Sequence, residues 1–122
     1  MRQYELDDYP ELASWFRARG MLPPCDEDLP DEGVIVPGVA AGFLIQTDTS
    51  AAIIDFFISN PETSPRIRGE ALNEIARELV GRASQLGFKR VTCNSQLDTI
   101  VRRARALGFQ ELGDFKAFSK EI

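Results

Sequence analysis

Between an apolar run and a long amphipathic segment, the chain reads Ser64-Pro65-Arg66-Ile67-Arg68-Gly69-Glu70-Ala71. The apolar run, residues 51–58, is typical of a buried strand, and residues 69–86 repeat apolar side chains at helical spacing. A short loop between a strand and a helix N-terminus suits an anion, because unpaired backbone N–H groups and the helix dipole both face the ligand there. The two arginines add fixed positive charge that suits phosphate oxygens. The segment therefore predicts a phosphate site at the start of a helix that begins near Gly69.

The length and composition are those of a small globular protein. The chain has 122 residues, of which 43% are hydrophobic and 27% are charged. This length fits a single domain over residues 1–122 with one modest core. No apolar run approaches the roughly 20 residues that span a bilayer, and the first residues lack the apolar core of a signal peptide. These features predict a cytoplasmic protein that does not contact a membrane.

The charge of the chain and its histidine and cysteine content argue against several classes of site. The net charge of −5 speaks against a general nucleic-acid binder, whose affinity depends on neutralising phosphates. Because the chain has no histidine, His-based triads and the usual zinc sites are excluded. Cys25 and Cys93 lack metal-ligand spacing, and the apolar pattern around Cys93 is typical of a small buried hydrophobic residue. We therefore expect no metal site.

The pattern of apolar and polar residues predicts a mixed α and β fold. Residues 51–59 are apolar along nearly their whole length, so we expect a central strand that is covered on both faces. The strand after the long helix should lie parallel beside it, and Gly42 marks a bulge or a weak spot in an earlier strand. The expected order is a strand at 2–6, a helix from Asp8 to Gly20, an acidic loop at 23–32, strands at 34–36, 39–47 and 51–59, a helix at 69–86, a strand at 88–93, a helix capped by Asn94 and Ser95, and strands at 109–112 and 115–120.

This order is similar to that of the GNAT family, the GCN5-related N-acetyltransferases. The spacing Arg66-x-x-Gly69-x-Ala71 resembles the family's pyrophosphate loop, and Gly108-Phe109 resembles the pair through which its last helix enters the sixth strand. The resemblance covers nearly the whole chain and implies a compact member of bacterial or phage origin. It implies an α+β fold with a mixed, mostly antiparallel sheet of six to seven strands and three to four helices. In the middle of that sheet, a parallel pair of strands would splay apart.

The resemblance implies acetyl-CoA as cosubstrate, bound where the two parallel strands part. The backbone of residues 57–59 would pair with the pantetheine arm much as an added strand does. The backbone N–H groups of residues 66–71 would hold the pyrophosphate, and the small Gly69 and Ala71 would let the backbone approach it. The implied coenzyme-binding residues are Phe57, Ile58, Ser59, Arg66, Ile67, Arg68, Gly69, Glu70, Ala71 and Asn94.

A basic run on the last predicted helix has two readings. Arg102, Arg103 and Arg105 can form a solvated face, which is the common reason for such a run. The resemblance implies that this helix borders the coenzyme, so one of the three arginines could instead reach the adenosine phosphate.

Two side chains that often take part in GNAT catalysis are replaced by apolar residues in this chain. GNAT chemistry needs a base for the attacking ammonium and often a Tyr for the leaving thiolate, but the usual Tyr position is Ala104 here, and a frequent Asn position is Leu97. Asp55, on the central strand, and Ser95, at the mouth of the gap, are the candidate catalytic residues. Asp55 could equally be a charge on the open part of its strand or the partner of an Arg, and Ser95 could cap a helix.

The leading hypothesis is an acyl-CoA-dependent N-acyltransferase that moves an acetyl group to a primary amine of a small molecule or a protein. The alternative is a GNAT-fold protein without catalysis, encoded by a phage, that acts as a protein-binding or structural module. A toxin-like GNAT that acetylates aminoacyl-tRNA is a third reading, which the acidic balance of the chain disfavours. The acceptor, the length of the acyl chain and a homodimer remain open.

Overall fold

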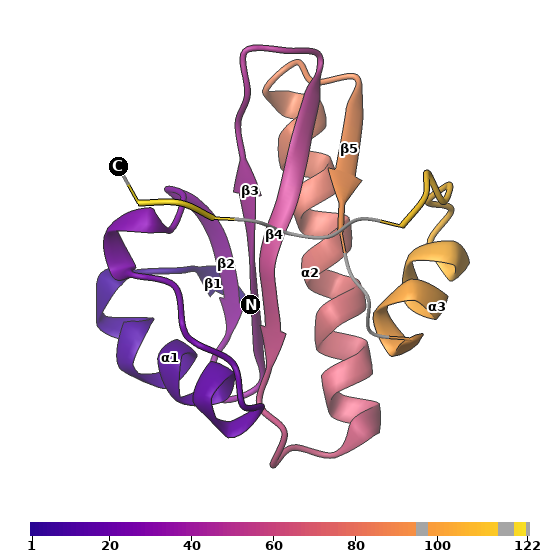
Figure 1. Ribbon diagram of the computed structural model, residues 1–122. Coiled ribbons are helices and arrows are strands. Elements are labelled where there is room, and N and C mark those ends of the chain that lie inside the picture. The colour runs from indigo at the N-terminus through magenta and orange to yellow at the C-terminus, as the bar shows by residue number, and fades with distance from the viewer. Residues whose placement is uncertain (95–97, 115–118, 122) are drawn as a thin grey trace.

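A five-stranded sheet forms the middle layer of the described part of the protein (Figure 1). The computed structural model describes residues 1–94, 98–114 and 119–121. The strands follow one another in space as they do in sequence, and each neighbouring pair is antiparallel except β4 and β5, which are parallel. The strands are β1 (Arg2–Gln3), β2 (Glu32–Val36), β3 (Ala40–Ile45), β4 (Ala51–Ser59) and β5 (Arg90–Cys93).

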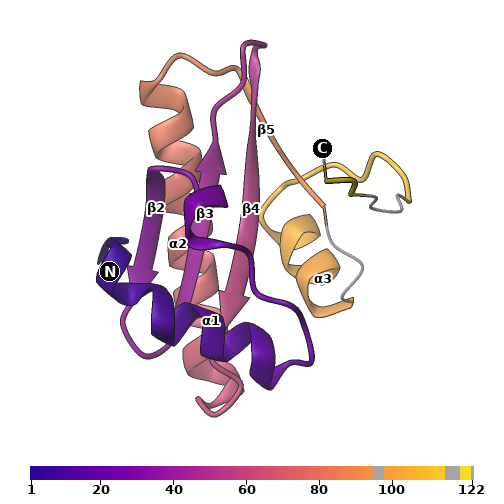
Figure 2. The same cartoon turned by 60° about the vertical axis from the view of Figure 1, so that its left-hand side comes forward.

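Helices cover both faces of this sheet. They are α1 (Tyr9–Ala18), α2 (Pro65–Gln85) and α3 (Asp98–Ala106), with short 3-10 turns at Leu6–Asp8 and Asp26–Asp28. Figure 2 shows α1 on one face of the sheet and α2 on the other. Within the described chain, none of the helices combines the length and the apolarity that crossing a bilayer requires.

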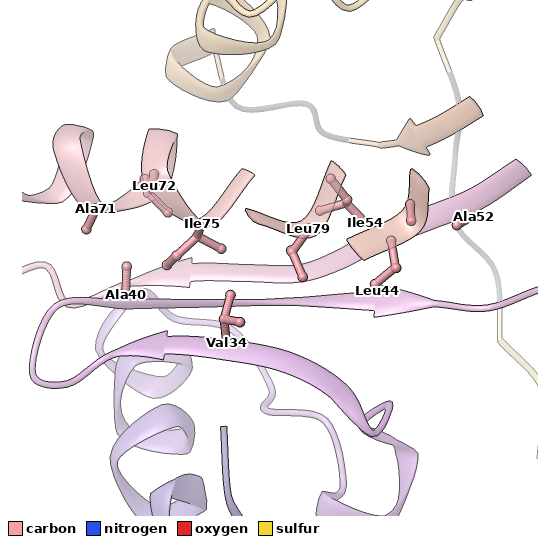
Figure 3. Close-up of a cluster of buried hydrophobic side chains, with 10 residues drawn as sticks. Val34, Ala40, Leu44, Ala52, Ile54, Ala71, Leu72, Ile75 and Leu79 are labelled. Carbon is pink, nitrogen blue, oxygen red and sulfur yellow. The ribbon is translucent and has the colours of Figure 1, made fainter. Parts of the chain in front are cut away.

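The core on the α2 face confirms the predicted amphipathic helix. Figure 3 shows Leu72, Ile75 and Leu79 of α2 directed toward the sheet, where they meet apolar side chains of β2, β3 and β4. Ile75 and Leu79 are fully buried. On the opposite face, Leu12, Trp15 and Phe16 of α1 form a second core. The long apolar strand predicted at 51–59 therefore is β4, covered on both faces as its composition required.

The start of α2 differs from the prediction. The helix begins at Pro65, one turn before Gly69, with Ser64 as its N-cap. The Ser64 hydroxyl accepts the Ile67 N–H at 3.3 Å. Serine at the cap and proline at the first position are both strong start signals, and here they prevail over the glycine. The segment expected as a loop is therefore the first two turns of the helix.

A bulge in β4 shapes the edge that faces β5. Ala41 pairs with Ile58 and Phe43 with Asp55, so β4 carries one residue more than β3 over this stretch. Phe56 has a φ of 52°, a left-handed conformation that is unusual for a residue with a side chain. Gly42 lies opposite, and a Cβ there would come within 2.8 Å of the Phe57 ring. The bulge predicted at Gly42 is confirmed, with the extra residue on the neighbouring strand.

The prediction of further strands after α3 is wrong for the residues that the structure describes there. The described chain contains five strands rather than six to seven, so the parallel pair lies at the edge of this sheet and not in its middle. Residues 109–112 form no strand, and Leu112 is 74% exposed. Phe109 packs against the core on the α2 face, whereas residues 110–112 are exposed. Residues 119–120 are not in a strand either, and the rest of the predicted strand at 115–120 lies outside the described residues.

Tyr4 carries a hydroxyl whose removal we expect to be harmless. Its ring packs edge-on against Phe43 with the centroids 4.8 Å apart, and the hydroxyl is buried without a hydrogen-bond partner among the described residues. Burial, helped by the charge of Asp8, raises the pKa of Tyr4 from 10.0 to about 12. Because the unfolded chain releases this proton first, folding stability should fall as the pH rises from about 10 to about 12.

We therefore expect Tyr4→Phe to leave the free energy of unfolding at pH 7 unchanged or raised, since no hydrogen bond is lost. The variant should also lose less stability than the wild type between pH 10 and pH 12. Urea unfolding at pH 7 and at pH 11 measures both effects. A clear destabilisation at pH 7 would mean that the hydroxyl has a partner in solution.

Candidate functional site at the parting of β4 and β5

The parallel strands β4 and β5 are paired over only part of their length. Their register runs from Ala51 opposite Arg90 to Ile54 opposite Cys93. Beyond this point β4 continues through residues 55–59, whereas β5 ends at Cys93. The two strands part at their C-terminal ends, as the resemblance implied, and Figure 1 shows β4 extending beyond the end of β5. In the described chain, no strand pairs with the edge of residues 55–59 that faces away from β3.

A cavity of about 370 Å³ lies at this gap. Its walls include residues from both faces of the sheet, because α1 lies on one face, α2 lies on the other, and each contributes a residue to the lining. The cavity therefore passes through the plane of the sheet where the strands have parted. The lining consists of residues 54–57 of β4, Cys93 and Asn94 at the end of β5, Phe16 of α1 and Met21 after it, Ala76 of α2, and Arg103, Ala104, Leu107 and Phe109 in and after α3.

The β4 bulge forms one wall of the cavity. Asp55 is exposed, and its Oδ1 accepts the N–H of Phe56 at 2.7 Å, which supports the left-handed conformation of Phe56. No arginine forms an ion pair with Asp55 among the described residues, so the reading of Asp55 as a partner of an arginine is not supported. The carboxylate thus combines exposure with a place in the wall of the gap.

Arg103 is the charged residue of α3 that reaches the cavity. Its Nη1 donates to the Gly69 carbonyl at 3.0 Å and to Asn73 Oδ1 at 3.1 Å, which ties α3 to the second turn of α2. Its Nε is buried without an acceptor, and burial lowers the pKa of Arg103. Among the described side chains no carboxylate pairs with this guanidinium. A partly desolvated cation without a counter-ion favours an anionic ligand.

The other two arginines of the run lie differently. Arg102 is exposed, and Arg105 pairs with Glu111 at 2.6 Å on the surface. The three arginines could not be distinguished from the sequence. Their different surroundings follow from the way in which α3 packs against α2. The solvated reading therefore fits Arg102 and Arg105, and the ligand reading fits Arg103.

The residues predicted to hold a pyrophosphate have mixed placements. Arg66 is exposed and forms an ion pair with Glu70 at 3.2 Å. Arg68 donates to the carbonyls of Pro61 and Thr63, so it holds the turn that precedes α2. Gly69, Glu70 and Ala71 lie inside the helix, where an N–H group normally donates to the carbonyl four residues earlier. The anion site expected along this segment is thereby reduced to the first turn of α2, which includes the exposed Ile67.

Of the residues predicted to pair with pantetheine, some line the cavity and others do not. Phe57 lines the cavity, whereas Ile58 is buried in the core beneath α1. Ser59 is bound by Arg19, whose Nε donates to the Ser59 carbonyl at 2.9 Å and whose Nη2 donates to the hydroxyl at 2.7 Å. Burial and the nearby charge of Arg68 lower the pKa of Arg19. Arg19 could not be predicted as a partner of Ser59, because nothing in the local sequence pattern links it to a strand 40 residues away.

The remaining predicted residues lie at the end of β5. Asn94 is exposed at the mouth of the gap and lines the cavity. Cys93 is half-buried, and burial raises the pKa of its thiol, which disfavours the nucleophilic thiolate. Ser95, predicted as a catalytic residue, and Leu97 lie outside the described residues.

Comparisons with known proteins address the fold. No family model and no curated protein matches the sequence. An acetyltransferase from Trypanosoma brucei matches the structure with a TM-score of 0.69 and 15% identity, over 98% of this chain and 97% of that one. Glucosamine-6-phosphate N-acetyltransferase from Arabidopsis thaliana matches with a TM-score of 0.66 and 12% identity, over 98% and 97%.

An aminoglycoside 6'-N-acetyltransferase from Acinetobacter haemolyticus matches with a TM-score of 0.61 and 14% identity, over 98% of this chain and 96% of that one. At such identities the likeness concerns the arrangement of helices and strands, and it extends over nearly the full length of each protein. Together with the parted parallel strands, it shows that this chain has the GNAT fold, the fold of these acetyltransferases.

Proposed function

We propose that this protein is an acyl-CoA-dependent N-acyltransferase that uses acetyl-CoA to acylate a primary amine. The observation that carries the proposal is the cavity at the gap between β4 and β5, which lies beside a strand edge without a partner. An extended, amide-containing arm can bind such an edge as an added strand would. A concave and mostly apolar cavity with a few polar groups is the usual form of a small-molecule site.

Positive charge near the start of α2 supports an anionic carrier for the acyl group. Arg19 and Arg68 lie close enough for each charge to affect the other, and Arg103 lies in the cavity wall beside α2. The dipole of α2, a helix of 21 residues, adds to their field at its N-terminus. Guanidinium groups bind phosphate oxygens in forked geometry. We assign the diphosphate of the coenzyme to this region.

The chemistry assigned to the site is a direct transfer, for which acetyl-CoA supplies a thioester. The amine nitrogen forms a bond to the acyl carbon, the bond between that carbon and the sulfur breaks, and the leaving thiolate takes up the second proton that the nitrogen releases. Asp55 accepts the proton that the ammonium group releases before attack, directly or through a water molecule. Because Asp55 is both exposed and part of the cavity wall, it can exchange this proton with solvent.

Replacing Asp55 by Asn tests the proposed base without removing the hydrogen bond to Phe56, since the amide oxygen can still accept the N–H at the bulge. We expect the rate of thiol release from acetyl-CoA, measured with a panel of primary amines, to fall on the order of 100-fold. A rate that is unchanged across pH would exclude this role, and thermal unfolding checks that the fold is intact.

Binding of the coenzyme tests the proposal as a whole. A ligand that binds only the native state at 100 times its dissociation constant adds about 2.7 kcal/mol to the free energy of unfolding. We expect a shift of this size in the thermal unfolding of the protein with millimolar acetyl-CoA. Absence of any shift at that concentration would contradict the transferase function.

A second candidate is a GNAT-fold protein that binds a partner without catalysis. The helical state of Gly69–Ala71 favours it, because these N–H groups lie within the helix rather than facing a ligand. This candidate predicts no thermal shift with acetyl-CoA, so the same measurement separates the two functions.

A further inference from the structure

Arg103 differs from the other two arginines near the start of α2, because it forms part of the cavity wall. Arg19 and Arg68 do not belong to the described lining, and they donate to the carbonyls of Ser59 and Pro61 in the segment that leads into α2. Arg103 shares its wall with Asp55, the proposed base. Its charge therefore borders the space in which the acyl group would be transferred.

The guanidinium of Arg103 is fixed on one side and has donors left over. Its Nη1 donates to the Gly69 carbonyl at 3.0 Å and to Asn73 Oδ1 at 3.1 Å, which holds α3 beside α2 (Figure 1). Its Nε is buried and has no acceptor among the described residues. A guanidinium has five N–H donors, and a buried donor without an acceptor is unfavourable. A ligand in the cavity that supplies an acceptor would remove this cost.

The transfer reaction places such an acceptor in the cavity. When the bond between the acyl carbon and the sulfur breaks, its electron pair stays on the sulfur, which is a thiolate until it takes up a proton. The polar side chains of the described lining are those of Asp55, Cys93, Asn94 and Arg103. Asp55 repels an anion, whereas Cys93 and Asn94 bring no positive charge to it. Within the described lining, Arg103 is thus the cation that can meet the sulfur.

We propose that Arg103 is a catalytic residue that stabilises the leaving thiolate of the coenzyme through a charge-assisted hydrogen bond. This inference rests on the proposed transferase function and assigns its leaving-group step. The hydrogen bond forms as the carbon–sulfur bond breaks, and it is lost when the sulfur takes up the second proton that the nitrogen releases. Donors fixed in advance where charge develops stabilise a transition state, and the two contacts with α2 fix Arg103 in this way.

Binding of free CoA across pH measures the interaction without turnover. An opposite charge within about 4–6 Å lowers the pKa of an acidic group by about 1–3 units, and an ordinary cysteine thiol has a pKa of about 8.5. Because the bound thiol should ionise first, the affinity for CoA should rise with pH, by about tenfold for each unit of pKa shift once the free thiol is also ionised. Isothermal titration under reducing conditions from pH 7 to about pH 10 covers this range. S-methyl-CoA has no thiol proton, so its affinity should lack this rise.

The comparison of the two ligands isolates the thiol from the other titratable groups. Besides Arg103, the described lining contains Asp55 from β4 and Cys93 from β5, whereas its residues from α1 and α2 do not titrate. The contacts of Arg103 on α2, Gly69 and Asn73, do not titrate either. A change in the charge of Asp55 or Cys93 cannot favour the thiolate, because each of them becomes negative as the pH rises.

Two variants of α3 assign the effect to one arginine. Arg103→Gln should abolish the difference in pH dependence between CoA and S-methyl-CoA. Arg102→Gln removes the same charge from the next residue, which is exposed, and it should keep the full difference.

The outcomes separate this inference from the function on which it rests. Equal pH dependence of CoA and S-methyl-CoA in the wild type would overturn the role of Arg103 while binding itself remains. A difference that survives in a folded Arg103→Gln would assign the thiolate to another group and overturn it as well. If neither ligand binds at any pH, the transferase function itself fails. Should Arg103→Gln not fold, as judged by circular dichroism, the wild-type comparison decides, because Arg103 is the cation of the described lining.

Discussion

Replacing Phe43 by Ala is expected to lower the free energy of unfolding by about 3–5 kcal/mol, the usual cost of removing a large buried aromatic side chain. Phe43 is fully buried on β3, at the centre of the core beneath α1. Its ring packs edge-on against Tyr4 and also against Phe56, whose centroid is 6.1 Å away. Small domains are stable by only about 5–15 kcal/mol, so this single change should remove a large fraction of the total.

The loss should also reach the site, because Phe43 supports the strained residue of the bulge. Phe56 lines the cavity with a φ of 52° and depends on its neighbours to hold that conformation. Urea unfolding measures the loss of stability, and titration with the coenzyme measures the accompanying loss of affinity. Leu112→Ala is the control, since this residue is 74% exposed and its truncation should change neither quantity. A loss below about 1 kcal/mol for Phe43→Ala would mean that the core beneath α1 is loosely packed.

The sequence was sufficient to predict the features that depend on strong local patterns. An apolar run of nine residues made β4 recognisable, and the regular apolar stripe of α2 predicted both the helix and the face it buries. The parallel placement of β5 followed from the short connection after α2, and it is confirmed. These elements border the gap, but the gap itself was predicted from the family resemblance and not from these local patterns.

The start of α2 was wrong because two signals competed in one segment. Gly69 suggested a flexible loop, whereas Ser64 and Pro65 formed a cap and a first turn four residues earlier. The difference matters for function, since the segment in its helical form presents fewer free N–H groups than a loop would. A glycine in a loop and a glycine in a helix cannot be distinguished by spacing alone.

The contacts of the charged side chains near the gap could not be predicted from local patterns, because they depend on tertiary structure. Arg103 reaches Gly69 across 34 residues of sequence, and Arg19 reaches Ser59 across 40. Arg103 lies in α3 and Arg19 directly follows α1, and the local patterns of these helices show only amphipathic faces. The resemblance singled out Arg68 and, as one of three arginines, Arg103, whereas it did not point to Arg19.

Asn94→Trp is expected to abolish coenzyme binding without unfolding the protein. Asn94 follows the last residue of β5 and is exposed in the cavity lining, so an indole there would occupy the gap between the strands. Substitutions at exposed positions usually change stability by less than about 0.5 kcal/mol. At a concentration of acetyl-CoA that adds about 2.7 kcal/mol to the wild type, a 100-fold loss of affinity leaves only about 0.4 kcal/mol.

Lys89→Trp is the matched control for this prediction. Lys89 is also exposed and lies next to the other end of β5, where its N–H donates to the Ser50 carbonyl at 2.8 Å and the strands are paired. The same indole placed there adds equal bulk and apolarity but leaves the gap open, so the thermal shift with acetyl-CoA should match that of the wild type. If Asn94→Trp retains the full shift, the coenzyme does not enter between β4 and β5, and the proposed site is wrong even where binding itself is real. If both variants lose the shift, the effect comes from the added tryptophan rather than from the gap, because the two positions lie beyond opposite ends of β5.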